Sequence, residues 1–409
     1  MNSNRNYMRT ERAHFMCPNM HFGILAQIKS DHDAIRLKQS LHALQKAHPF
    51  LRSLIAEEKD TQKFYYQIQE QLEIPVTEGS DADTWQHDYD SIASQGWNVQ
   101  KESMLKVLVY PEEKTFRILF IAHHLLCDGR GLLQLVEEFA QHYIHKIMPA
   151  FAEEQLIRSI HDLPPKSDLS FISRLIINSA NKKWQKENHH VLYDEYLTFE
   201  KNFSKANPVR RTIDTIEGPE FAQIQDMCKR HGFSVNNYML ARMMSEESVH
   251  KVIIAADIRS QTACYRPGAM GNYATAFSVV VKTKTKDMIS LAKQIASKTV
   301  SIRKQPQKEM LVPACYLHMR PELIDAIAIS ALGRFESKAG AFVGKKMFGY
   351  GSRNGYSITN LGKIQSDTIA EAAFIPPASP ANRKTWGILT VNDRMKICQA
   401  VFPKQNDKG

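Results

Sequence analysis

A β-hairpin that leads directly into two histidines and a glycine-rich helix start constrains the fold most. Residues 104–110 and 115–122 are β-rich runs, separated by a Pro-Glu-Glu-Lys turn. An amphipathic helix is predicted after residue 131, because its apolar residues share one helical face: Leu132, Val136, Phe139 and Tyr143. Residues 123–129 therefore lie at a strand–loop–helix junction, where rigid elements can hold a reactive side chain.

Similar patterns along the rest of the chain predict a mixed α/β protein (α+β type). The predicted strands cover residues 21–29, 51–56, 62–67, 252–257, 276–282, 356–360, 368–374, 385–391 and 395–402. The predicted helices cover residues 34–47, 169–186, 234–244, 289–302 and 321–332, and residues 212–231 predict a strand followed by a helix. Strands and helices alternate in both halves, which favours a pseudo-duplicated architecture.

The length of 409 residues exceeds one ordinary core and suits two domains. The composition becomes polar and irregular between about residues 150 and 205, around Pro164-Pro165. We therefore expect an N-terminal subdomain at residues 1–155, a crossover linker at 156–205 and a C-terminal subdomain at 206–409.

The composition indicates a globular protein, with 43% hydrophobic and 23% charged residues. No stretch approaches the roughly 20 continuous apolar residues of a transmembrane helix. The first 20 residues lack the apolar core of a secretory signal, and the six cysteines form no CxxC pair. We expect a cytoplasmic protein with reduced cysteines.

The net charge of +10 raises the question of nucleic acid. The Lys and Arg residues are spread along the whole chain, and no nucleic-acid-binding module is recognisable, so no nucleic-acid partner is expected. A positive field would also attract an anionic cosubstrate such as coenzyme A, or an acidic carrier protein. The alternative is a solubilising surface without a specific partner.

The chemistry is concentrated in the run His123-His124-Leu125-Leu126-Cys127-Asp128-Gly129. Acyl transfer from a thioester needs a base for the attacking group and donors for the oxyanion. Histidine titrates near neutrality and can take and return this proton. The aspartate can pair with a distant arginine and fix the loop, and the glycine allows a backbone that a side chain would obstruct.

This run matches HHxxxDG, the signature of the chloramphenicol acetyltransferase-like superfamily, which includes condensation domains, polyketide-associated acyltransferases and alcohol acetyltransferases. Other stretches resemble family segments: Asp257-Ile258-Arg259 with Gly271-Asn272, Thr359-Asn360-Leu361-Gly362, and residues 374–377 with 386–390. Together they span nearly the whole chain. The plant BAHD sequence DFGWG is missing, so the chain resembles the condensation, polyketide-associated and alcohol acetyltransferase branches more closely.

The resemblance implies a role for each matching residue. His124 would be the general base, and His123 would be buried and structural. Asp128 would form a salt bridge with Arg259, and Asp257 would support this pair.

The same resemblance implies an oxyanion site opposite the base. The Gly129 N–H, with Thr359 or Asn360 from a facing strand, would bind the oxyanion. Phe15 and Phe22 are expected near the substrate tunnel.

The resemblance further implies two chloramphenicol acetyltransferase-like subdomains with mixed sheets, arranged as a V around a central tunnel. The implied function is acyl transfer from acyl-CoA or an acyl-carrier protein to a small-molecule, lipid or peptide acceptor with a hydroxyl or amine. A stand-alone condensation enzyme and an inactive acyl- or carrier-binding relative are the alternatives. We expect a monomer without cofactor or metal. A metal site at His123, His124 and Asp128, or a nucleophilic Cys127, is a weaker interpretation.

Overall fold

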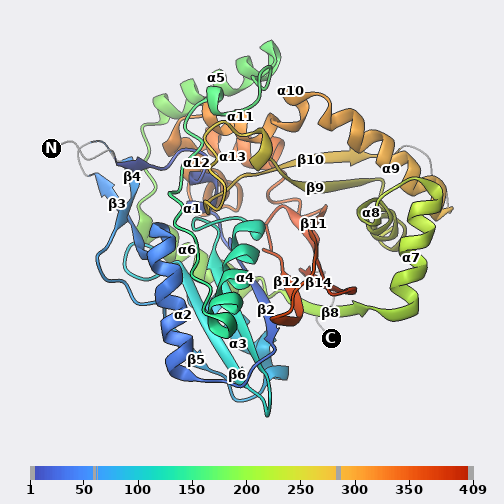
Figure 1. Cartoon of the computed structure of the whole chain (residues 1–409). Helices are drawn as coiled ribbons and strands as arrows, with labels where there is room; N and C mark the ends of the chain where they lie inside the picture. The colour runs from blue at the N-terminus through green and yellow to red at the C-terminus, as the bar shows by residue number, and fades with distance from the viewer. Residues whose placement is uncertain (1–4, 59–60, 62, 282–286, 404–409) are drawn as a thin grey trace.

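The computed structural model describes residues 5–58, 61, 63–281 and 287–403. Two large mixed sheets and a small three-stranded sheet, with helices around them, form the molecule (Figure 1), which confirms the expected α/β class. The outermost residues of two predicted strands, Gln62 and Lys282, lie outside the described residues.

The five-stranded sheet carries the motif at the end of a central strand. Its order is β12 (Ile369–Ile375), β2 (His21–Ile28), β7 (Phe116–His123), β6 (Leu105–Pro111) and β5 (Val76–Glu78). The predicted hairpin is β6 and β7, and β2 pairs with β7 so that His21 faces His123. Nearly every side chain of β2 and β7 is buried, because both faces of this sheet are covered.

Two helices complete this half of the molecule. Helix α2 (Ala34–Ala47) begins at Asp33, whose carboxylate accepts hydrogen bonds from the N–H groups of Ile35 and Arg36. Helix α4 (Gly129–His145) begins directly after the motif and packs against α2 and β2. Its buried face includes the four apolar residues that predict the helix.

The six-stranded sheet forms the other half. Its order is β10 (Ala274–Val280), β9 (Lys251–Asp257), β11 (Gly355–Ile364), β13 (Asn382–Val391), β14 (Arg394–Val401) and β8 (Arg210–Ile216). The strand β11 is parallel to both neighbours, whereas the other pairs are antiparallel. The helices α7 (Gly218–His231), α8 (Val235–Glu246) and α9 (Met288–Arg303) belong to this half.

The remaining elements surround these two sheets. A three-stranded sheet has the order β1 (Asn6–Tyr7), β4 (Lys63–Ile68), β3 (Ser53–Glu58). The remaining helices are α1 (Arg12–Phe15), α3 (Trp85–Ser94), α5 (Phe171–Glu187), α6 (Tyr193–Ala206), α10 (Pro306–Glu309), α11 (Leu311–His318), α12 (Pro321–Ala331) and α13 (Lys338–Phe342). A π-helical turn, η5 (Val343–Met347), follows α13.

Two features differ from the predicted organisation. Strand β12, which comes late in the chain, completes the N-terminal sheet by pairing with β2. The crossover region contains a second helix, α6, in addition to the predicted α5. Its aromatic residues are buried at helical spacing: Tyr193, Tyr196, Phe199 and Phe203. The division at residues 155 and 206 stays a prediction.

Across the part of the chain that the structure describes, no helix has both the length and the apolar character of a membrane span.

Candidate active site

A cavity of about 780 Å³ lies where the two halves meet. The N-terminal half contributes His124, His14 and Met20 to its lining, and the C-terminal half contributes residues of β9, β10 and β11. Of the sequence-predicted site residues, His124 and Thr359 line this cavity. The cavity is large enough for a small-molecule or acyl substrate.

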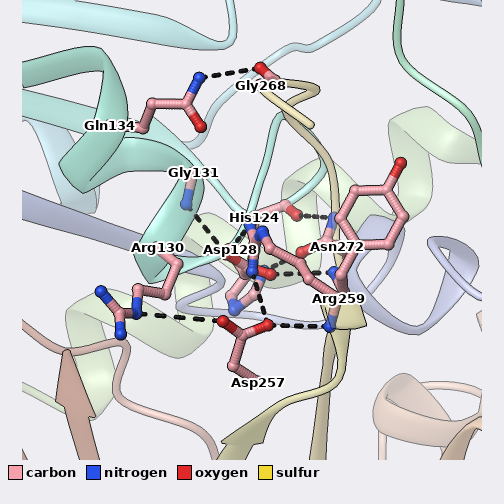
Figure 2. A network of polar contacts seen from close by, with 10 residues as sticks. His124, Asp128, Arg130, Gly131, Gln134, Asp257, Arg259, Gly268 and Asn272 are labelled. Atoms are coloured by element: carbon pink, nitrogen blue, oxygen red, sulfur yellow. Dashed lines mark hydrogen bonds and ion pairs between the residues drawn. The ribbon is translucent and has the colours of Figure 1, made fainter. Parts of the chain in front are cut away.

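His124 is held from two sides at the end of β7. Its backbone N–H donates to the Met20 carbonyl at 2.8 Å. Its Nδ1 lies 2.9 Å from Asn272 Oδ1, and Asn272 Nδ2 donates to the His124 carbonyl at 2.8 Å. Figure 2 shows this pair of contacts across the boundary between the two halves.

These two contacts determine the tautomer of His124. The Asn272 amide is oriented by its bond to the His124 carbonyl, so its oxygen faces Nδ1. An amide oxygen only accepts, and therefore Nδ1 carries the proton. The lone pair of the neutral ring is then on Nε2, which makes no hydrogen bond within the described residues. This is the state that a general base requires.

Burial lowers the pKa of His124 below its usual value, although Asp128 and Asn272 act in the opposite direction. The imidazole is therefore neutral at pH 7 and available to accept a proton. Removing the ring from water is the larger of these effects, since the charged form loses its hydration.

Asp128 connects the motif to the loop that carries Asn272. Its carboxylate accepts hydrogen bonds from the N–H groups of Gly131 at 3.0 Å and Tyr273 at 2.8 Å. Its own N–H donates to the Gly271 carbonyl at 3.1 Å. Because these contacts lie on either side of Asn272, Asp128 positions the amide that orients His124. Gly271 has a φ of 136°, a conformation open to glycine.

Arg259 forms the ion pair that the sequence predicts. Its Nη2 donates to Asp128 Oδ1 at 2.7 Å, and its Nη1 donates to Asp257 Oδ1 at 3.1 Å (Figure 2). Burial alone would raise the pKa of Asp128, but Arg259 and the two N–H groups outweigh it and hold this pKa below its usual value. Asp128 is thus charged and buried, and its carboxylate accepts hydrogen bonds from Arg259, Gly131 and Tyr273.

His14 is a site residue that the motif does not reveal. Its ring stacks on the ring of His124, with 4.1 Å between centroids and 5° between planes. Burial, followed by the proximity of His124, lowers the pKa of His14 well below its usual value, so this ring is also neutral. Phe22 lies against His124 as well, at 4.9 Å between centroids. The base therefore packs against two rings.

His123 and Cys127 are part of the core. Burial lowers the pKa of His123 to about 3, and its Nδ1 accepts a hydrogen bond from the Leu125 N–H. Burial raises the pKa of the Cys127 thiol well above its usual value, and this side chain is fully buried. A thiolate nucleophile at Cys127 is therefore disfavoured, because the thiol neither ionises readily nor reaches the cavity.

The predicted oxyanion residues are placed unequally. Thr359 lines the cavity, whereas Gly129 and Asn360 are not among the described residues that line it. Asn360 instead donates to Asn236 and accepts from the Gly362 N–H. A Cβ on Gly129 would lie 2.8 Å from Leu361 Cδ2, so close packing against β11 accounts for this glycine.

Phe15 and Phe22 lie beside cavity-lining residues, since Phe15 follows His14 in the chain and Phe22 contacts His124. Phe15 stacks on Tyr193 in the core, and Phe22 contacts His124 without lining the cavity. Phe277 and Phe348 line the cavity instead. Sequence spacing did not reveal this, because the side chain that faces a cavity depends on how the two sheets meet.

The chain has the fold of solved condensation domains and of an acetyltransferase, which confirms the fold that the motifs imply. Residues 19–150 match the condensation domain family. A comparison with curated proteins gave no match.

Solved structures similar to this chain cover it almost completely. Polyketide synthase associated protein 5 from Mycobacterium tuberculosis is 13% identical, with a TM-score of 0.59 over 99% of this chain and 94% of that one. The first condensation domain of the CDA synthetase is 9% identical, with a TM-score of 0.63 over 99% and 93%. The trichothecene 15-O-acetyltransferase TRI3 from Fusarium sporotrichioides is 11% identical, with a TM-score of 0.62 over 97% and 90%. At these identities the likeness concerns the fold.

Proposed function

We propose that the protein is an acyltransferase that moves an acyl group from a thioester to a hydroxyl or amine acceptor, with His124 as general base. The observation that carries this proposal is the Asn272 contact, which leaves the lone pair of a neutral His124 on Nε2 beside the cavity. The condensation match and the acetyltransferase among the similar structures support this reaction class.

In the proposed reaction, His124 Nε2 takes the proton from the acceptor as its oxygen or nitrogen attacks the thioester carbonyl carbon. The tetrahedral intermediate then collapses, the carbon–sulfur bond breaks, and the imidazolium returns its proton to the leaving thiolate. Thr359 is the predicted oxyanion residue whose side chain can reach the cavity. Asp128, Arg259 and Gly129 hold the loop, and the reaction needs neither a metal nor a cofactor.

The donor in this proposal is acyl-CoA or an acyl-carrier protein. A stand-alone condensation enzyme acting on carrier-bound groups is the second candidate, and the match of residues 19–150 to the condensation domain favours it. Both candidates use the same base and cavity. They differ in that the condensation enzyme acts only on carrier-bound groups, whereas the acyltransferase can also use acyl-CoA and a free acceptor.

Free thiol should be measured with a panel of acyl-CoAs and acceptors, with and without carrier protein. Release without carrier supports the first candidate, and strict dependence on carrier supports the second. The variant His124→Ala should lose most of this release. Its matched control is His142→Ala, which changes a buried histidine of α4 that bonds Ser40 and is not among the described residues lining the cavity. No release from any donor would overturn both candidates and leave an inactive binding relative.

A further inference from the structure

Helix α5 exposes an apolar surface that the fold leaves uncovered. It buries a narrow strip of Ile177, Ala180 and Trp184 against the rest of the molecule. Its first two turns expose four large apolar side chains: Phe171 at 76%, Ile172 at 70%, Leu175 at 52% and Ile176 at 40%. A contiguous exposed group of this kind marks an interaction surface, in contrast to single exposed side chains.

The same side of α5 is basic further along. The exposed Lys182, Lys183 and Lys186 lie about three turns after the apolar residues, so they share one face. Two acidic residues at the ends of α5 already have partners. Glu187 accepts a hydrogen bond from Ser337, and Asp168 pairs with Arg174 and His318.

The elements beside α5 extend this surface. Phe342 of α13 is 42% exposed, and Lys183 Nζ lies 5.7 Å from the centre of its ring. Exposed lysines flank Phe342 in the chain at positions 338 and 345. The surface therefore combines protruding apolar side chains with a basic border.

This surface adjoins one end of the cavity. Helix α5 contacts α11 and α13 at the outer rim of the molecule (Figure 1). Residues of α11 (Val312, Pro313, Tyr316) and of η5 (Lys346, Met347) line the cavity. Asn181 of α5 also donates to the His318 carbonyl at the end of α11. Helix α5 therefore packs against elements that form part of the cavity wall.

We propose that α5 docks the protein on an anionic membrane surface, with its four apolar side chains in the headgroup–acyl boundary and its lysines at lipid phosphates. A bilayer accepts side chains that protrude from a convex helix without a complementary groove, and anionic lipids match the basic border. This proposal is independent of the proposed reaction.

The test is flotation of the full chain with phosphatidylglycerol–phosphatidylcholine vesicles and with phosphatidylcholine vesicles. We expect binding to the anionic vesicles to be at least about tenfold stronger and to weaken with salt. The double variant Phe171→Ser/Leu175→Ser should reduce binding at least about tenfold, because it removes two inserted side chains. The variant Lys182→Glu/Lys183→Glu should abolish the preference for anionic lipid.

The matched controls change equally exposed residues elsewhere. Ile35→Ser/Val300→Ser removes side chains that are 70% and 51% exposed, and Lys293→Glu/Lys298→Glu alters the charge of α9. Both controls should bind vesicles like the unmodified protein. Equal binding by the α5 variants, or no vesicle binding at all, would overturn the proposal. A dimer, or a complex with an acidic carrier protein, that the Phe171→Ser/Leu175→Ser variant disrupts without any vesicle binding would assign the surface to that occupant instead.

Discussion

The two large sheets meet the cavity in different ways. Strands β2 and β7 of the five-stranded sheet are buried along nearly their whole length, and only the end of β7 presents His124. In the six-stranded sheet, alternate residues of β9 and the first five residues of β10 line the cavity along much of each strand. Most of the β9 and β10 residues that line the cavity are small, namely Ala255, Ala274, Thr275, Ala276 and Ser278, and the larger ones are Lys251, Ile253 and Phe277.

This difference separates two tasks. The five-stranded sheet and the Asp128 network hold one imidazole rigidly, whereas the small side chains of β9 and β10 leave room for substrate. Changes in the first region should therefore affect stability and rate, and changes in the second should affect substrate choice.

The largest effect is expected from Asp128→Ala. It leaves Arg259 buried without its main partner and frees the loop around Asn272, so we expect a loss of about 3–5 kcal/mol in the free energy of unfolding. Urea unfolding measures this loss. The control Asp257→Asn removes the more exposed partner of Arg259 and should cost about 1 kcal/mol or less. Equal losses of stability in both variants would contradict the role of Asp128 in pairing with Arg259 and holding the loop around Asn272.

The same carboxylate gives the stability a dependence on pH. The folded-state pKa of Asp128 is depressed, so its contribution is present above the unfolded value of about 3.9 and is lost as pH falls through the folded pKa. Unfolding midpoints measured at decreasing pH should show this loss in the unmodified protein. Asp128→Asn should remove this part of the acid dependence.

The second-largest effect is expected from Ala276→Phe, which places an aromatic ring on the cavity wall formed by β9 and β10. Ala276 pairs with Ala255 across β9 and β10, and both line the cavity. The added ring occupies space that a long or bulky substrate needs, so kcat/KM for such substrates should fall about tenfold or more relative to acetyl donors. A single methylene in a hydrophobic pocket already changes kcat/KM by this order. The control Val280→Phe lies on the same strand outside the lining. An unchanged preference in Ala276→Phe would contradict the division of tasks.

The smallest effect is expected from His14→Leu, which removes the ring stacked on the base. Aromatic pairs contribute about 0.5–1.5 kcal/mol, so we expect a two- to tenfold lower kcat with little change in KM. His14→Phe keeps a flat ring and should retain most of the rate. A rate in His14→Leu equal to that of the unmodified protein would show that Phe22 and Asn272 are sufficient to orient His124.

Local signals made much of the fold predictable. Helix α2 combines a capping Asp33 with a regular apolar face, and the β6–β7 hairpin follows from two β-rich runs around a turn. Strand β12 was predictable as a strand, but nothing in its residues indicates that it pairs with β2. Helix α6 was missed because its polar surroundings obscured four aromatic residues at helical spacing.

The site was predictable where residues belong to a motif. The ion pair of Asp128 with Arg259 follows from two motif segments far apart in the chain. His14 belongs to none of them, and its stacking on His124 depends on how α1 packs beside the end of β7. Asn272 stands in a matching segment, yet its control of the His124 tautomer is a matter of geometry.

The most direct test of the central claim compares thiol release by the unmodified protein and by His124→Gln across a range of pH. The unmodified protein should show a rate plateau at neutral pH, with an acid limb below the usual histidine value of about 6.5, because burial lowers the pKa of His124. His124→Gln should be about 10²–10⁴-fold slower on this plateau and lack the acid limb. A variant that keeps both the plateau rate and the acid limb would contradict the assignment of His124 as the base.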